Sequence, residues 1–164
     1  MALLRDDLRR WGLLRSLYRR LMRRLAPFLH LSFAMARPLG RNEARQTHAG
    51  CSLRVATRAD LLRATANPAL QMTPAFVDYA LSRGDICTAA FDGDDIVAYV
   101  WRAFVPTRHK DDVWLTFEPP YRYGYKALTL PAWRGRHLQE MLGPVADRLC
   151  IERGHTHAIG FIET

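Results

Sequence analysis

The sequence predicts an α/β (α+β) domain with a mixed, mainly antiparallel central sheet flanked by helices, preceded by a basic amphipathic helix. Helical spacing of apolar residues occurs before Ser82 and again after Arg134. Between Ile86 and Leu130 the apolar residues instead form short runs typical of strands. One more strand-like run closes the chain, so the order is strand, helices, antiparallel strands, helix and strand, which predicts a mixed sheet.

Composition is typical of a folded chain with a basic appendage. The 164 residues are 49% hydrophobic and carry a net charge of +8, with much of the excess in the first 25 residues. Cys51, Cys87 and Cys150 are odd in number and show no C-x-x-C spacing. A disulfide framework and a cysteine-ligated zinc site are therefore not expected. Free cysteines of this kind favour a cytoplasmic location.

Residues 3–25 have the pattern of a basic amphipathic helix. Leu4, Leu8, Trp11, Leu14, Tyr18 and Leu25 fall on one helical face, and arginines fill most of the remainder until Pro27. The apolar face can pack on the domain or on a second copy of the chain. It can also lie on an anionic membrane surface, which would place the protein peripherally at the inner membrane. Nucleic-acid binding is the least expected use, because no recognised motif accompanies the arginines.

The chain divides into residues 1–36, which hold this helix and a short apolar segment, a polar linker at 37–51, and a domain at 52–164. The most apolar run, residues 25–36, is too short to span a membrane and contains Pro27 and His30. It ends in a pattern resembling a signal cleavage site, but Asp6 and Asp7 and the long preceding region argue against a secretory signal.

The domain begins with a strand at residues 52–56 and two helices. Thr57 is a predicted N-cap for a helix that starts at Arg58, and Thr73-Pro74 predicts the start of a second helix. Strands are expected at 86–91 and 96–104, joined by Asp92-Gly93-Asp94-Asp95, and at 113–117 and 123–130. A helix between residues 134 and 154 precedes a last strand at 155–162.

The stretch Pro131-Ala132-Trp133-Arg134-Gly135-Arg136 links a strand to the start of a helix. Such a junction points unpaired backbone N–H groups and the positive end of a helix dipole at one place, which makes an anion site. An ordinary turn with solvated arginines is the alternative that these residues alone leave open.

This loop resembles the Pro-x-x-Arg-Gly-x-Gly-x-Gly-like loop of the GCN5-related N-acetyltransferase (GNAT) family, and the hairpin from Phe91 to Val100 is similar to that family's second and third strands. The resemblance implies an acyl-CoA N-acyltransferase fold and a reaction that moves an acyl group, most simply acetyl, from CoA to an amine. Acetyl-CoA or another acyl-CoA is the implied cosubstrate, with no metal. The enzyme would transfer groups other than aminoacyl groups.

The resemblance also implies cofactor-binding positions. Backbone groups of Leu128, Thr129 and Leu130 would hold the pantetheine arm, and loop residues would bind the pyrophosphate: Arg134, Gly135, Arg136, His137, Leu138 and Gln139. His137 and Gln139 stand where the family most often has glycine, so their side chains are expected to narrow the approach to a phosphate. The family continues beyond its fifth strand with residues that supply the general acid, so this chain is expected to be truncated.

Two residues are candidates for proton transfer. Glu118 follows a predicted strand and is expected to line the cleft beside the splayed strands, and Tyr125 lies on the next strand. His155 and His157 are expected on one strand face, exposed or lining a cleft, without enough further ligands for a metal site. Two alternatives remain: a non-catalytic binding module on the same fold, and a membrane-associated acyltransferase for long acyl chains.

Overall fold

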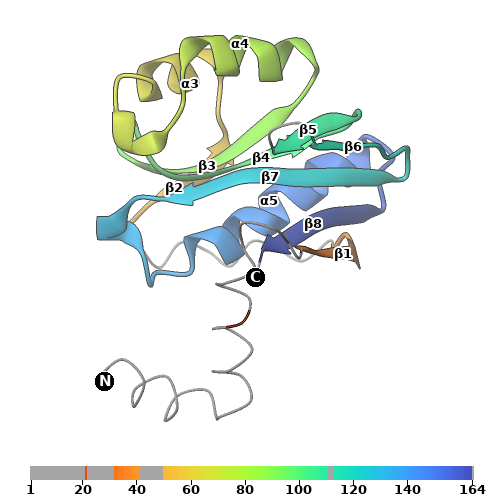
Figure 1. Ribbon diagram of the computed structural model, residues 1–164. Coiled ribbons are helices and arrows are strands. Elements are labelled where there is room, and N and C mark those ends of the chain that lie inside the picture. The colour runs from red at the N-terminus through yellow and green to blue at the C-terminus, as the bar shows by residue number, and fades with distance from the viewer. Residues whose placement is uncertain (1–20, 22–31, 41–49, 111–112, 164) are drawn as a thin grey trace. The chain divides into compact units, whose positions relative to one another are not determined.

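The computed structural model describes Leu21 and residues 32–40, 50–110 and 113–163 (Figure 1). The predicted N-terminal helix lies outside these residues except for Leu21, as does most of the predicted linker. Residues 35–160 form one compact unit, which holds every contact discussed below. Residues 1–34 and 161–164 form a second unit. Among the described helices, none has the length and apolar character needed to cross a membrane.

From β2 onward the described elements follow the predicted order of strand, helices, strands, helix and strand, with β5 as an additional strand. Their bounds are β1 (Ser32–Pro38), β2 (Ser52–Val55), α3 (Arg58–Ala64), η1 (Pro68–Leu70), α4 (Pro74–Ser82), β3 (Ile86–Asp92), β4 (Asp95–Ala103), β5 (Thr107–Lys110), β6 (Val113–Leu115), β7 (Tyr121–Thr129), η2 (Pro131–Trp133), α5 (Leu138–Glu152) and β8 (His157–Glu163).

The main sheet has the strand order β1-β8-β7-β4-β3-β2. Strands β2, β3, β4 and β7 pair antiparallel, whereas β8 pairs parallel to β7. Helices α3 and α4 cover one face of this sheet and α5 covers the other (Figure 1). The prediction of a mixed, mainly antiparallel sheet flanked by helices is confirmed.

The first helices start where the sequence predicts, because side chains satisfy their free amides. The Thr57 hydroxyl accepts a hydrogen bond from Asp60 N at 3.2 Å, and the Asp60 carboxylate accepts one from Thr57 N at 2.9 Å. Thr73 caps α4 in the same way through the amide of Phe76. Gly93 takes a φ of +58° in the turn between β3 and β4, a conformation that favours glycine.

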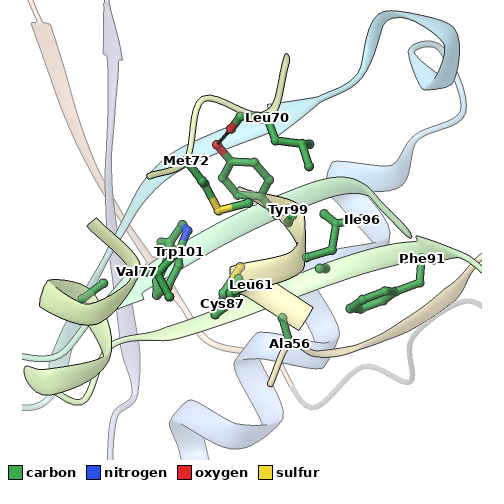
Figure 2. Packing of buried hydrophobic residues seen from close by; sticks show 13 residues of the cluster. Ala56, Leu61, Leu70, Met72, Val77, Cys87, Phe91, Ile96, Tyr99 and Trp101 are labelled. Atoms are coloured by element: carbon green, nitrogen blue, oxygen red, sulfur yellow. Dashed lines mark hydrogen bonds between the residues drawn. The ribbon is translucent and has the colours of Figure 1, made fainter. Parts of the chain in front are cut away.

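The larger core cluster lies between the sheet and the α3–α4 layer (Figure 2). Leu61 and Val77 from the helices pack with Tyr99 and Trp101 of β4, and the Tyr99 hydroxyl donates to Leu70 O at 2.7 Å. A second cluster includes Ala98 and Val100 of β4 and Leu138 and Leu142 of α5. Strand β4 is therefore apolar on both faces, which explains its continuous hydrophobic run from Ile96 to Trp101.

Three elements differ from the prediction. Strand β1 includes Arg37 and Pro38, which the sequence analysis assigns to the linker, because Arg37 pairs with distant Asp147 and Leu39 N donates to Thr156 O at 2.8 Å. Strand β5 is not predicted, and the run predicted at 113–117 pairs with it in a separate two-stranded sheet. His155 precedes β8 and is buried against Phe104, which contradicts the first of the two expectations for it, that it is exposed or lines a cleft.

Candidate active site

Strand β7 loses its partner strand halfway along its length. It pairs with β8 only from Tyr121 to Tyr123, whereas its pairing with β4 continues to Thr129. In the described part of the chain, no strand pairs with the other edge of β7 from Gly124 to Thr129. An unpaired strand edge presents backbone N–H and C=O groups that can bind an extended ligand.

A β-bulge lies in the middle of this free segment. Between the pairs Trp101–Tyr125 and Tyr99–Leu128, strand β7 has one residue more than β4, and Lys126 takes a φ of +45°. A bulge bends the strand and redirects neighbouring backbone groups. The local sequence does not predict this bulge, because the residue with positive φ is a lysine and not a glycine.

The strand then runs into η2 and a short loop that opens α5. The amides of Trp133 and Arg134 donate hydrogen bonds to carbonyls at the start of η2. In α5, the amide of Met141 donates to the carbonyl of His137. The amides in between have no acceptor among the described residues: Gly135, Arg136, His137, Leu138, Gln139 and Glu140. This run of free donors at the start of a 15-residue helix has the geometry on which the predicted anion site depends.

The loop side chains leave these donors accessible. Arg134 and Arg136 are both exposed, with Arg134 Nε donating to Thr129 O at 3.3 Å and the Arg136 guanidinium lying 4.3 Å from the centre of the Trp133 ring. His137 has a φ of +56°, which is the conformation that glycine adopts most readily, and its exposed ring lies 3.2 Å from Glu140. The loop therefore has the positive-φ conformation typical of glycine at His137, although the residue is not glycine.

The side chain of Gln139 points toward the sheet. Its Nε2 donates to Leu128 O at 2.9 Å, to Tyr99 O at 3.2 Å and to Thr129 Oγ1 at 3.0 Å. Those carbonyls flank the bulge, so the amide of Gln139 satisfies acceptors that the interrupted ladder leaves open. The expected narrowing of the phosphate approach by this side chain does not occur, because the chain is directed away from the loop.

Negative charge lies near one side of the loop. A pocket of about 500 Å³ between α3, η1 and the β3–β4 turn has Leu130 and Trp133 on its wall together with Asp92, Asp94 and Asp95. These carboxylates would repel a phosphate, so an anion is favoured at the α5 amides and disfavoured inside this pocket.

Two tyrosines of β7 are hydrogen-bonded to titratable side chains. The Tyr125 hydroxyl donates to Asp85 Oδ2 at 2.7 Å, and the Tyr123 hydroxyl lies 2.6 Å from His109 Nδ1. Their rings stack with centroids 5.9 Å apart. Asp85 and His109 are missed by sequence reasoning, because each is distant from its tyrosine in the chain and neither belongs to a motif.

The two candidates for proton transfer have different surroundings. Glu118 is exposed in the segment before β7, and its backbone carbonyl accepts a hydrogen bond from Tyr121 N at 3.0 Å. Tyr125 is half-buried between Phe76 and Trp101. Burial raises the pKa of Tyr125, and Asp85 raises it further, so its hydroxyl is protonated at neutral pH. No cluster of three metal-ligating side chains occurs in the ranges that the structure describes.

No protein-family model matches the sequence, and no curated protein matches it. Solved structures do. A GCN5-related N-acetyltransferase from Kribbella flavida matches with a TM-score of 0.54 and 14% identity, over 87% of this chain and 53% of that one. One from Sphaerobacter thermophilus matches with a TM-score of 0.53 and 13% identity, over 88% and 47%. A GNAT-family protein from Novosphingobium aromaticivorans gives 0.52 and 14%, over 84% and 54%.

The chain therefore has the GCN5-related N-acetyltransferase fold. It spans about half the length of those three structures. At this level of identity the likeness establishes the fold and leaves the chemistry to the residues of the site.

Proposed function

We propose that this chain is an acyl-CoA-dependent N-acyltransferase that moves an acyl group, with acetyl the simplest case, to the amine of an acceptor. One observation carries the proposal: the free edge of β7 leads directly into a run of unpaired amides at the start of α5. An extended ligand with a phosphate group at one end fits both features, and the phosphopantetheine arm of CoA has that form.

The residues take roles that follow from their positions. Backbone groups of Leu128, Thr129 and Leu130 would bind the pantetheine amides, and the amides from Gly135 to Gln139 would bind the pyrophosphate. Arg134 and Arg136 add positive charge beside the phosphates. Both arginines are exposed and hold no carboxylate in the described residues, so they can turn to a ligand.

The thioester carbonyl would then lie near the bulge at Lys126, because the phosphates bind beyond the far end of β7. The acceptor amine attacks this carbonyl, the C–S bond breaks, and CoA leaves as the thiolate. Tyr125 lies next to the bulge with a hydroxyl that stays protonated, which favours it over exposed Glu118 as the group that exchanges a proton with the reactants.

A thermal-shift titration with acetyl-CoA tests the cofactor site. At about 100 times its dissociation constant, the ligand should add roughly 2.7 kcal/mol to the free energy of unfolding. The double variant Arg134→Ala/Arg136→Ala should lose most of this stabilisation. Arg58→Ala/Arg63→Ala removes two positive charges from α3 and should retain it. An unshifted melting curve for the unaltered chain would rule out the proposed cofactor.

A further inference from the structure

Asp85 is a buried carboxylate with an unused oxygen. It lies between α4 and β3, and its side chain is 1% exposed. Oδ2 accepts the Tyr125 hydroxyl at 2.7 Å and lies 3.8 Å from Arg83 Nε, whereas Oδ1 is buried without a hydrogen-bond partner among the described residues. Burying a carboxylate with an unmet acceptor costs free energy, so its retention at this place needs an explanation.

The aromatic side chains around Tyr125 fix where its hydroxyl points. Its ring stacks on Tyr123 at 5.9 Å and lies 6.4 Å from both Phe76 and Trp101, centroid to centroid. Tyr125 pairs with Trp101 at one end of the bulge, immediately before Lys126. A ring packed in this way holds the hydroxyl in one geometry toward Asp85.

The position of Tyr125 along β7 matches the expected position of the acyl group. Phosphates bound at the α5 amides would place the pantetheine arm along the free edge from Thr129 toward Gly124. The thioester is at the end of that arm, and the acceptor amine must approach it from beyond. Tyr125 lies at this end of the free edge, whereas Arg134 and Arg136 lie at the other.

We propose that Asp85 is a positioning residue that accepts, through the Tyr125 hydroxyl, the proton released by the acceptor amine. The inference rests on the proposed function. As the amine nitrogen bonds to the thioester carbon, its N–H proton passes to Tyr125 Oη, and the hydroxyl's own proton passes to Asp85 Oδ2. The C–S bond breaks, and the CoA thiolate takes a proton from water. Asp85 then returns its proton to water through the same hydroxyl.

The charges around the pair support this direction of proton flow. Burial raises the pKa of Asp85, while the Tyr125 hydrogen bond and the charge of Arg83 oppose that rise. A carboxylate with a raised pKa is a better proton acceptor near neutral pH than an ordinary one. Besides Asp85, Arg83 and Cys87 influence Tyr125: the charge of Arg83 lowers the pKa of its hydroxyl, and the Cys87 thiol on β3 stays protonated because burial raises its own pKa.

Acetyl transfer from acetyl-CoA to hydroxylamine tests the proposal, because this small amine needs no acceptor pocket. Release of CoA would be followed across the pH range for the unaltered chain, Tyr125→Phe and Asp85→Asn. Tyr99→Phe is the matched control, since it also removes a core hydroxyl that donates one hydrogen bond, to Leu70 O. Thermal shift with acetyl-CoA would be measured for each variant to separate binding from transfer.

The proposal predicts that Tyr125→Phe and Asp85→Asn each lower kcat by about 100-fold or more with little change in the KM for acetyl-CoA. The rise of kcat with pH that reports ionisation of Asp85 should disappear in Asp85→Asn and persist in Tyr99→Phe. Unchanged kcat and pH profile in both variants would overturn it, as would acetyl-CoA binding without transfer to hydroxylamine. If acetyl-CoA fails to bind the unaltered chain, the proposed function itself fails, which the thermal shift reveals separately.

Discussion

At the scale of single residues, the backbone of His137 is the clearest departure from what its side chain prefers. A non-glycine residue at positive φ costs about 1 kcal/mol, and the contact of its exposed side chain with Glu140 offsets little of that cost. His137 is the residue directly before α5, and its left-handed backbone conformation sets the direction in which the chain enters the helix. The loop keeps the glycine-type conformation at the expense of some stability.

We therefore expect His137→Gly to be as stable as the unaltered chain or more stable, by up to about 1 kcal/mol, because relief of strain outweighs the entropy that glycine adds to the unfolded chain. Arg134→Gly is the control in the same loop, since Arg134 has a φ of −68° and gains nothing from glycine. Urea denaturation measures both. Equal destabilisation by the two substitutions would contradict this account.

Asp85 links stability to pH. Its folded-state pKa is raised by burial above the ordinary value of about 3.9, so protonation favours the folded state. Its favourable contribution is complete below the ordinary pKa and is lost as the pH rises through the raised one. The ionised form is the less stable one, and the relay proposed above uses that form.

Asp85→Asn should consequently gain stability relative to the unaltered chain as the pH rises across this window. The test is denaturant unfolding at a series of pH values from about 4 to 8. Asp78→Asn, which alters an exposed carboxylate paired with Arg58, provides the reference. A stability difference that does not vary with pH would show that Asp85 titrates normally.

At the scale of elements, side-chain caps decide where α3 begins. Asp60 accepts from Thr57 N and also binds Arg54 Nη2 at 3.1 Å and Arg63 Nη2 at 2.8 Å, although its side chain is nearly buried. The Arg54 hydrogen bond holds the pKa of Asp60 well below its usual range, against the opposing effect of burial. One carboxylate thus fixes both the helix start and the end of β2.

Asp60→Ala should lower the free energy of unfolding by about 2 kcal/mol, since it removes the capping box and leaves Arg54 without its partner. The loss should shrink below about pH 4, where Asp60 protonates in the unfolded state while it stays ionised in the folded one. Calorimetry at two pH values would show this. A loss that is equally large in acid would point to packing as the cause.

Helix α5 is fixed by a second buried carboxylate. Asp147 accepts from Arg37 at 2.8 and 3.1 Å and from buried Arg122 at 2.5 Å. Burial alone would raise its pKa, but the Arg37 hydrogen bonds and the charge of Arg122 outweigh that effect and lower it. These contacts join one end of β1 and one end of β7 to the body of α5, and so hold the strand that bears the site against the helix proposed to bind the anion.

Asp147→Asn should cost about 3–5 kcal/mol, because Arg122 would be left buried without a counter-charge. Arg37→Ala removes only a half-exposed partner and should cost about 1 kcal/mol or less. Chemical denaturation of the two variants provides the comparison. Similar losses for both would mean that Arg122 finds another partner.

Local signals explain how much of these elements could be predicted. Thr57, Thr73 and Gly93 act on their immediate neighbours, so the helix starts and the hairpin are predictable from the sequence. The Pro131–Arg136 loop is equally local. Strand β1 and the bond from Tyr125 to Asp85 depend on residues distant in the chain, and no pattern in either segment indicates the partner.

At the scale of the whole molecule, the fold brings together the two halves of the proposed ligand site, which lie on different elements. Strand β7 provides the free edge, and α5 provides the amides, while Gln139 ties the first turn of α5 to the bulge in β7. The family resemblance pointed to these residues, but only the fold shows that the side chain of Gln139 supports the sheet. Breaking that tie with Gln139→Ala should weaken acetyl-CoA binding.

Hydrogen–deuterium exchange with and without CoA tests the central claim most directly, because the claim concerns backbone amides. The account predicts slower exchange in two separate segments, Gly124–Leu130 and Gly135–Glu140, with unchanged exchange in α3. Protection of both segments by CoA would place the cofactor along β7 with its phosphates at α5. Binding of CoA without protection in either segment would contradict the account.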